Sequence, residues 1–267
     1  AVVASGEQVT SGLTALALQE LGIPARSWQG WQIPIRTDDV HAKARICSIE
    51  TEELERRLST GEVAVVAGFQ GLSPNGRITT LGRGGSDTSA VALAAAIKAD
   101  RCDIYTDVDG VYTTDPRIEP KARRMKKIAF EEMLELASLG AKVLQTRSVE
   151  LAMRYKVRLR VLSSFEDTDE TSGTLVCDED EIMESKVVNG VASSRDEAKI
   201  TLVTVEDRPG ISAAIFAPLA EAGVNVDMIV QNIGADGTTD MTFTVGKADL
   251  ARAQDVLEKA RAEMGFE

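Results

Sequence analysis

The sequence predicts an α/β protein with two domains, and three observations support this class. Over residues 1–180, short apolar segments typical of buried strands alternate with helical patterns. Within that region, a glycine-rich loop at Thr80–Ala90 leads directly into a helix. From residue 186 onward, a shorter alternation of strands and helices follows an acidic stretch. The chain is therefore expected to form a larger layered domain and a smaller second one.

Composition limits the kinds of function that the chain can have. It has 267 residues, of which 43% are apolar and 27% charged, as in ordinary soluble globular proteins. A formal net charge of −12 argues against a general nucleic-acid surface, and no apolar run is long enough to cross a membrane. Three widely spaced cysteines favour reduced thiols over a disulfide framework. We expect a cytoplasmic protein without nucleic-acid or membrane partners.

The helices and strands of the first domain are predicted from the spacing of apolar residues and from helix-breaking glycine and proline. The first helix has apolar residues at helical spacing and ends at Gly22 and Pro24, which both break helices. The run Val63–Ala67 is continuously apolar, which is typical of a strand buried on both faces in a mainly parallel sheet. Helices are predicted at Glu7–Leu21, Ser86–Ala99, Phe130–Leu139 and Ala141–Tyr155, and strands at Arg45–Ile49, Glu62–Gly68, Asp103–Tyr105 and Val157–Leu162.

The second domain is predicted at residues 186–267. Acidic runs between Glu166 and Glu181 separate it from the first domain, with the boundary near Glu181–Lys186. The pattern then predicts strands at Lys199–Val205, Asn225–Asn232 and Thr239–Val245, and helices at Ile211–Ala222 and Leu250–Met264. This β-α-β-β-α order is that of a ferredoxin-like unit that lacks its last strand.

The glycine loop carries the strongest chemical signal. Gly82, Gly84 and Gly85 surround Arg83, and Ser86–Thr88 begins the next helix. Glycine allows positive φ angles and close approach of a ligand to the backbone. The free N–H groups of a helix start attract anions, and a guanidinium can bind a carboxylate or phosphate through two hydrogen bonds. The loop therefore predicts a site for an anionic small molecule.

A second polar segment, Tyr105–Arg117, follows a predicted strand. Ligands of open α/β sheets bind at the carboxyl ends of strands, which favours a binding role. The alternative is a polar hairpin around the Asp109-Gly110 turn signal. The chain has no Walker sequence, so any nucleotide site here has another design.

Taken in order, these motifs resemble those of aspartate kinases of the amino-acid kinase superfamily. The resemblance rests on Ala4–Glu7, Thr80–Ala90, Thr106–Arg117, Gly140–Lys142 and Glu206–Gly210. It implies an amino-acid kinase-like three-layer sandwich followed by an ACT domain, the amino-acid-sensing module of biosynthetic enzymes. It also implies transfer of the γ-phosphoryl group of ATP to the side-chain carboxylate of L-aspartate. The product, 4-phospho-L-aspartate, begins the biosynthesis of lysine, threonine and methionine.

The same resemblance implies roles for individual residues. Catalysis is assigned to Glu7, Arg83 and Asp87, and aspartate binding to Glu7, Arg83, Gly84, Gly85 and Ser86. Nucleotide binding is assigned to Thr106, Asp107, Val108, Asp109, Gly110, Val111, Tyr112, Arg117 and Lys142. Effector binding is assigned to Asp207, Arg208, Pro209, Gly210, Ile211, Ser212, Asn225, Val226, Asp227 and Gln231.

The resemblance also implies cofactors and partners. ATP brings Mg²⁺, whose ligands are expected to be mainly phosphate oxygens and waters. Its protein ligands stay open, with Asp87, Asp107 and Asp109 as candidates. Lysine, threonine or both are the expected feedback effectors. Pairing of ACT domains implies a homodimer, or a heterotetramer with a separate regulatory chain.

Two departures from the family pattern qualify these expectations. The family begins with a Lys-x-Gly-Gly-Thr/Ser phosphate loop, which this sequence does not contain. The strand expected at Val187–Ala192 resembles the opening piece of a second ACT unit whose remainder is also missing. Relative to the family, the chain is truncated at both ends, and residues 1–267 alone are expected to be inactive. Two alternatives stay open: a kinase of glutamate or acetylglutamate, and an amino-acid-sensing regulator with a non-catalytic kinase-like domain.

Overall fold

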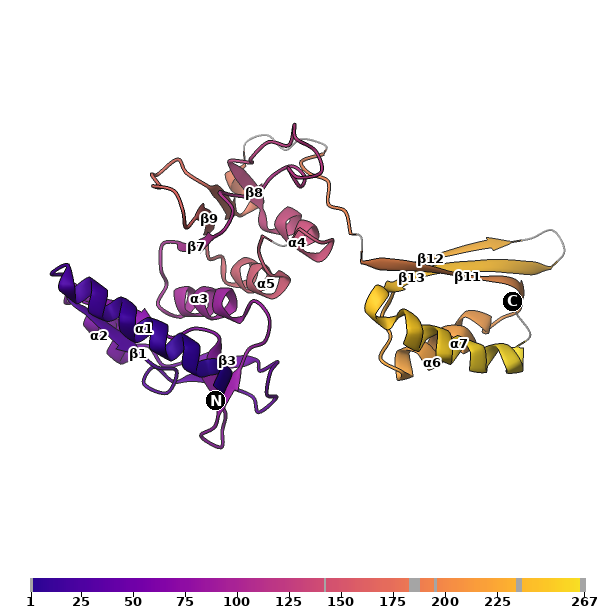
Figure 1. Cartoon of the computed structure of the whole chain (residues 1–267), viewed down its shortest axis with the longest axis horizontal. Coiled ribbons are helices and arrows are strands. Elements are labelled where there is room, and N and C mark those ends of the chain that lie inside the picture. Colours follow the sequence, from indigo (N-terminus) through magenta and orange to yellow (C-terminus); the bar gives the residue numbers. More distant parts are fainter. Residues whose placement is uncertain (1, 142, 183–187, 195, 234–236, 265–267) are drawn as a thin grey trace. The chain divides into compact units, whose positions relative to one another are not determined.

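The computed structural model describes residues 2–141, 143–182, 188–194, 196–233 and 237–264. The chain divides into two compact units, Ala1–Ser193 and Ser194–Glu267 (Figure 1). This division falls a few residues after the boundary expected near Glu181–Lys186. The relative placement of the two units is not defined, so each is described by itself.

A four-stranded mixed sheet and three helices form the main core of the first unit. In spatial order its strands are β7 (Cys102–Thr106), β9 (Leu159–Ser163), β10 (Thr174–Cys177) and β8 (Lys127–Ala129). Strands β7 and β9 are parallel, as are β10 and β8, whereas β9 and β10 are antiparallel. Helices α3 (Gly85–Ala96), α4 (Phe130–Ser138) and α5 (Thr146–Tyr155) lie together beside it in Figure 1. Apolar side chains from all of these elements form one core cluster.

Two smaller sheets complete the first unit. One contains β3 (Ile46–Ile49), β2 (Ile35–Thr37), β5 (Gln70–Leu72) and β6 (Ile78–Thr80) in that order. The other is the parallel pair β1 (Ala25–Trp28) and β4 (Val63–Val66), against which α1 (Val2–Glu20) and α2 (Glu52–Leu58) pack. A short 3₁₀ turn, η1 (Glu179–Glu181), follows β10.

The second unit has the strand–helix order that the sequence predicts. Its elements are β11 (Glu197–Glu206), α6 (Ile211–Glu221), β12 (Val226–Ile233), β13 (Thr238–Gly246), η2 (Lys247–Asp249) and α7 (Leu250–Met264). The strands form an antiparallel sheet in the order β11-β13-β12. Helices α6 and α7 bury Ile215, Leu219 and Leu257 against Phe243 and its neighbours on β13. In the part of the chain that the structure describes, no helix is both long and apolar enough to span a bilayer.

The α/β class and the ferredoxin-like second unit are thus confirmed, although the two four-stranded sheets of the first unit are mixed. The prediction of a fully buried strand at Val63–Ala67 was wrong. Val63 is 39% exposed and Ala64–Val66 are half-buried. The reason is that β4 pairs with β1 alone among the described strands, so one edge is uncovered.

Two further elements differ from expectation. The helix predicted at Ala141–Tyr155 begins only at Thr146, because Gln145 has extended backbone angles (φ −84°, ψ 137°). The strand expected at Val187–Ala192 is not formed over residues 188–192, and Val187 lies outside the described residues. Residues 188–192 instead lie beside the loop that comes after β7. The Val191 N–H donates to the Thr113 carbonyl of this loop at 2.7 Å.

A largely buried ion pair joins β7 to β9. The Arg160 Nη2 lies 2.8 Å from Asp103 Oδ2, and Arg101 Nε donates to Asp103 Oδ1 at 2.6 Å. The Arg160 side chain is 10% exposed and that of Asp103 is 21% exposed. Burial alone would raise the pKa of Asp103, but the hydrogen bonds from Arg160 and Arg101 outweigh it and hold this pKa below its ordinary value.

The substitution Asp103→Asn is expected to lower the free energy of unfolding by about 3 kcal/mol at pH 7, because it leaves the buried Arg160 charge uncompensated. A carboxylate with a lowered folded-state pKa stabilises the fold above its unfolded pKa. That stabilisation is lost as the pH falls through the folded pKa. The difference in the free energy of unfolding between the variant and the wild type should therefore become smaller as the pH is lowered. Urea unfolding at pH 7 and at a series of acidic pH values measures it.

The matched control is Arg56→Ala, which removes an exposed ion pair with Glu53 on α2. Exposed pairs contribute little, so this variant should unfold like wild type. Equal stability of Asp103→Asn and wild type at pH 7 would contradict the assigned role of the buried pair.

Candidate functional site

The glycine loop lies at the N-terminus of α3, as the sequence predicts. Gly82 (φ 86°) and Gly84 (φ 67°) have left-handed backbone angles, which other residues rarely adopt. Gly84 is the N-cap residue of α3 and makes no side-chain cap, so the start of α3 depends on backbone geometry. Arg83 and Ser86 are exposed beside this start. The structure thus brings together a helix N-terminus, the exposed Arg83 guanidinium and glycine backbone that a ligand can approach closely, which suits an anion.

Neighbouring segments hold the loop in this shape. A Cβ at Gly84 would lie 1.9 Å from Gln145 Cγ, and one at Gly82 would lie 2.6 Å from the Ala42 carbonyl oxygen. Arg147 on α5 donates to the carbonyl oxygens of Leu81 (3.0 Å) and Ala44 (2.8 Å). Sequence reasoning missed Gln145 and Arg147. No local signal marks them, because their partners lie far away along the chain.

Asp87 occupies the first turn of α3 and is half-buried. Burial raises the pKa of its carboxyl group. Within the described part of the chain, no hydrogen bond or ion pair of this carboxylate is found. A carboxyl group with a raised folded-state pKa destabilises the fold once it ionises, so at neutral pH Asp87 opposes folding. A carboxylate whose ionised form is destabilised by burial is suited to bind a cationic group. Asp87 is a functional-site candidate for that reason.

Glu7 lies on α1, which a buried glutamine ties to the region before the glycine loop. Gln70 is fully buried; its Oε1 accepts from Gln8 Nε2 at 2.9 Å, and its Nε2 donates to the Ala4 carbonyl at 3.4 Å. Glu7 is half-buried and lies one helical turn after Ala4, on the same side of α1. Gln70 is a third positioning residue that sequence reasoning missed.

Phe69, the residue before Gln70, connects this segment to α3. The Phe69 N–H donates to Ser89 Oγ at 3.1 Å, and the Ser89 hydroxyl donates to the Ser86 carbonyl at 2.9 Å. Gly68 lies so close that a Cβ there would be 2.9 Å from Ser89 Oγ. The N-terminal half of α1 and the first turn of α3 are therefore held through one short segment.

The segment Thr106–Tyr112 follows β7 and is fixed by Thr174 of β10. The buried Thr174 Oγ1 accepts from the Val111 N–H at 2.9 Å and donates to the Met125 carbonyl at 2.6 Å. Gly110 (φ 152°) lies where a Cβ would be 2.6 Å from Thr174 Oγ1. The segment is therefore a broad loop closed by a bridge between Tyr112 and Arg124, and the simple hairpin alternative at Asp109-Gly110 is wrong.

Polar groups of this loop bind one another. The Tyr112 hydroxyl donates to Asp109 Oδ2 at 3.3 Å, and Arg124 Nη1 donates to the same oxygen at 3.3 Å. Burial and this hydrogen bond raise the pKa of Tyr112. The Thr106 hydroxyl donates to Asp107 Oδ1 at 3.2 Å. Val108 belongs to the same bend of the chain.

The two basic residues predicted for the phosphates are in different situations. Arg117 is paired with Asp115 (Nη2 to Oδ2, 2.8 Å), and its side chain is 88% exposed. Lys142 lies outside the described residues. Across the described residues, no group of three or more His, Cys, Asp or Glu side chains could hold a metal ion.

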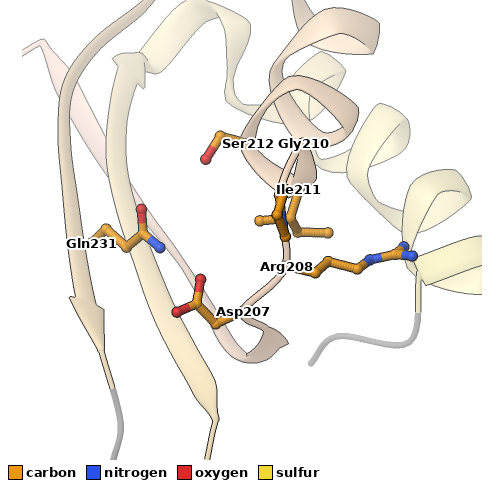
Figure 2. Close-up of a pocket in the computed structure, with 7 residues that line it drawn as sticks. Asp207, Arg208, Gly210, Ile211, Ser212 and Gln231 are labelled. Atoms are coloured by element: carbon orange, nitrogen blue, oxygen red, sulfur yellow. The ribbon is translucent and has the colours of Figure 1, made fainter.

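The predicted effector residues partly converge on one pocket of the second unit. The pocket has a volume of about 430 Å³ and is lined by Asp207, Arg208, Pro209, Gly210, Ile211, Ser212 and Gln231. Figure 2 shows the Asp207 carboxylate and the Gln231 amide pointing into it, with the Ser212 hydroxyl above them. The Arg208 side chain points away. Gly210 (φ 89°) is the N-cap residue of α6, so this pocket also contains a helix N-terminus.

Asn225, Val226 and Asp227 do not line this pocket. They lie at the start of β12, whereas Gln231 is four residues beyond Asp227 on the same strand. A strand rises about 3.3 Å per residue, so Asp227 is about 13 Å from Gln231 along it. Within one chain, these three residues form no part of the pocket.

Comparison with known proteins identifies the family to which this chain belongs. Residues 1–163 match the family model described as "Amino acid kinase family", and residues 199–262 match that of the ACT domain. The chain belongs to the amino acid kinase family. It is 57% identical over 265 residues to an aspartate kinase of Stutzerimonas stutzeri and 56% identical over 266 residues to an aspartokinase of Pseudomonas aeruginosa. Each alignment covers 99% of this chain and 64% of the relative, so the chain spans less than two thirds of these relatives.

Solved structures give the same result. The chain superimposes on E. coli aspartokinase III in complex with aspartate and ADP, with a TM-score of 0.75 at 31% identity, covering 98% of this chain and 59% of that one. For the same enzyme in complex with lysine and aspartate, the TM-score is 0.70 at 32% identity, with coverages of 96% and 57%. The resemblance to aspartate kinases that the motifs indicated is confirmed.

The substitution Gly84→Ala is expected to destabilise the protein by about 1–3 kcal/mol more than Gly76→Ala. Both glycines have similar positive φ angles (67° and 71°), so the backbone strain is shared. A Cβ at position 84 would also overlap the Gln145 side chain, whereas nothing lies within 4 Å of one at position 76. Urea unfolding of the two variants in parallel measures the difference. Equal destabilisation would mean that the Gln145 contact does not constrain the loop.

Proposed function

We propose that this chain is the greater part of a feedback-regulated aspartate kinase that transfers the γ-phosphoryl group of ATP to the side chain of L-aspartate. One observation carries the proposal: the glycine loop places Arg83, the N-terminus of α3 and the half-buried Asp87 in one short stretch. The names of the relatives, all aspartate kinases, support the same conclusion. The alternative of a non-catalytic sensor is less favoured, because the residues proposed to bind the acceptor are present.

The acceptor half of the proposed site needs both an anion-binding and a cation-binding group. Arg83 and the N–H group at Ser86 are suited to bind a carboxylate of aspartate, with Gly84 and Gly85 allowing its close approach. The N–H of Gly85 itself donates to the Gly82 carbonyl at 3.0 Å. Glu7 and Asp87 are suited to hold the ammonium group, since both are half-buried carboxylates on α1 and α3. Opposite charges on the two sides of the substrate would fix its orientation and present one carboxylate oxygen for reaction.

The nucleotide half is proposed to lie along Thr106–Tyr112. Thr106, Asp107 and Asp109 offer hydroxyl and carboxylate groups to the ribose or the base, and Tyr112 offers a ring. The backbone of Gly110 and Val111 is held by Thr174, and Val108 lies in the bend between these residues and Thr106. Arg117 and Lys142 are proposed to reach the phosphates. For Arg117 this requires an exchange of its surface partner Asp115 for the nucleotide.

Phosphoryl transfer depends mainly on positioning and charge neutralisation. The residues of this chain would align the aspartate oxygen with the γ-phosphoryl group and exclude competing orientations. Mg²⁺ brought by ATP would neutralise phosphate charge, and we propose that it is held mainly by phosphate oxygens and waters.

We further propose that the pocket of the second unit binds the feedback effector. Asp207 is suited to an amino-acid ammonium, the N-terminus of α6 to its carboxylate, and Gln231 or Ser212 to a polar side chain. A lysine complex of a structural relative favours lysine as the effector, with threonine as the second candidate. The outer strand β12 exposes Met228, Ile229 and Val230, which suits pairing of two ACT units. Such pairing, in a homodimer or a heterotetramer, could bring Asn225–Asp227 of one copy to the pocket of another.

The test of the kinase proposal is an assay of ATP- and Mg²⁺-dependent aspartyl phosphate formation by the complete polypeptide that carries this chain. Arg83→Ala is expected to raise KM for aspartate by about 10–100-fold and to leave KM for ATP nearly unchanged, because it removes a charge-assisted pair to the acceptor. The control is Arg77→Ala, an exposed arginine in the turn between β5 and β6. Lack of any aspartate-dependent reaction, or an unchanged KM for aspartate, would refute the proposal.

For the effector site, Asp207→Asn is expected to weaken lysine binding by about 10–100-fold, since the ammonium group loses its charged partner. Titration calorimetry with lysine and threonine measures it. Asp255→Asn, at an exposed position on α7, removes the same charge elsewhere in the unit and should bind as wild type does. Equal affinities of the two variants would exclude Asp207 from the site.

A further inference from the structure

Phe165 is an unusually exposed aromatic residue. Its side chain is 81% exposed, and among the large apolar residues that the structure describes only Val2, in the first turn of α1, is more exposed. Leaving a phenylalanine in water forgoes the stabilisation that burial would give. A residue in this situation is a candidate for contact with a ligand or partner.

The backbone at Phe165 is held in place by hydrogen bonds. Phe165 follows β9, all of whose residues are buried. Its N–H donates to Ser163 Oγ at 3.1 Å, and the N–H of the preceding Ser164 donates to the Thr106 carbonyl at 2.8 Å. The exposed ring therefore projects from a fixed position at the carboxyl end of the sheet.

That position is beside the segment proposed to bind the nucleotide. In the parallel pair β7–β9, Ser163 is the register partner of Thr106. Phe165, two residues after Ser163, therefore lies next to the start of the loop that follows Thr106. Phe165 thus directly follows Ser164, which contacts the Thr106 carbonyl at the start of the loop.

We propose that Phe165 forms the apolar face on which the purine base of the bound nucleotide stacks. Every base has a π-face, and stacking on an aromatic ring is favourable without any hydrogen bond. Thr106, Asp107 and Asp109 supply polar groups to the same edge, and Phe165 is the most exposed aromatic residue that the structure describes. This assignment rests on the proposed kinase function and adds a base-binding residue to it.

The test compares nucleotide binding with binding of a probe that has no base. Affinities for ADP and for tripolyphosphate are measured by titration calorimetry on the complete polypeptide that carries this chain. Phe165→Ala is expected to weaken ADP binding about 10-fold and to leave tripolyphosphate binding unchanged. Phe165→Trp keeps a stacking face and should bind ADP nearly as wild type does. The control is Tyr155→Ala, an aromatic residue that is 56% exposed at the end of α5, before the opposite end of β9.

The outcomes separate this inference from the function on which it rests. Unchanged ADP affinity in Phe165→Ala, with normal binding by wild type, would overturn the stacking role and leave the kinase proposal standing. An equal loss of ADP and tripolyphosphate binding would also overturn it, because it would indicate damage to the loop. Failure of the wild-type protein to bind ADP at all would overturn both. A change of oligomeric state with unchanged ADP affinity would assign Phe165 to a protein contact instead.

Discussion

The parallel pairing of β7 with β9 is the constraint on which the first unit depends. Both strands end at the same edge, so the loops after Thr106 and Ser163 emerge side by side. β9 is buried along its whole length, and Asp103 and Arg160 bind across the pair. Because the pair cannot shift without exposing apolar residues and separating these charges, the positions of the loops are fixed.

The helices extend this fixed position to the part of the site that we propose to bind the acceptor. α3 and α5 pack together over the same core, and Arg147 on α5 holds the carbonyl groups of Leu81 and Ala44. The N-terminus of α3 is therefore aligned relative to the sheet edge by two contacts, the buried core and the partly buried Arg147 hydrogen bonds. A glycine-rich loop could adopt many conformations by itself. These contacts hold it in a single conformation.

Some of the groups in the proposed site reduce the stability of the fold. Ionised Asp87 is half-buried without a partner in the described structure, and Phe165 leaves an apolar ring in water. Stability is gained instead in nearby contacts that touch no ligand, such as the buried Thr174 and Gln70 networks. This division is expected where binding groups must stay available and their supports must not move.

The sequence by itself determined the α/β class, the order of most helices and strands, the glycine loop and the family, because these depend on local periodicity, on backbone preferences of glycine and on contiguous motifs. It did not reveal the short strands β1, β2, β5, β6, β8 and β10, whose three or four residues carry too little periodicity. Only the tertiary structure identified Thr174 and Arg147, which act on residues 49 to 103 positions away. It also decided that β4 is partly exposed and that Asn225–Asp227 lie outside the pocket proposed for the effector. Both depend on which segments lie next to each other in space, and no pattern within either segment encodes that.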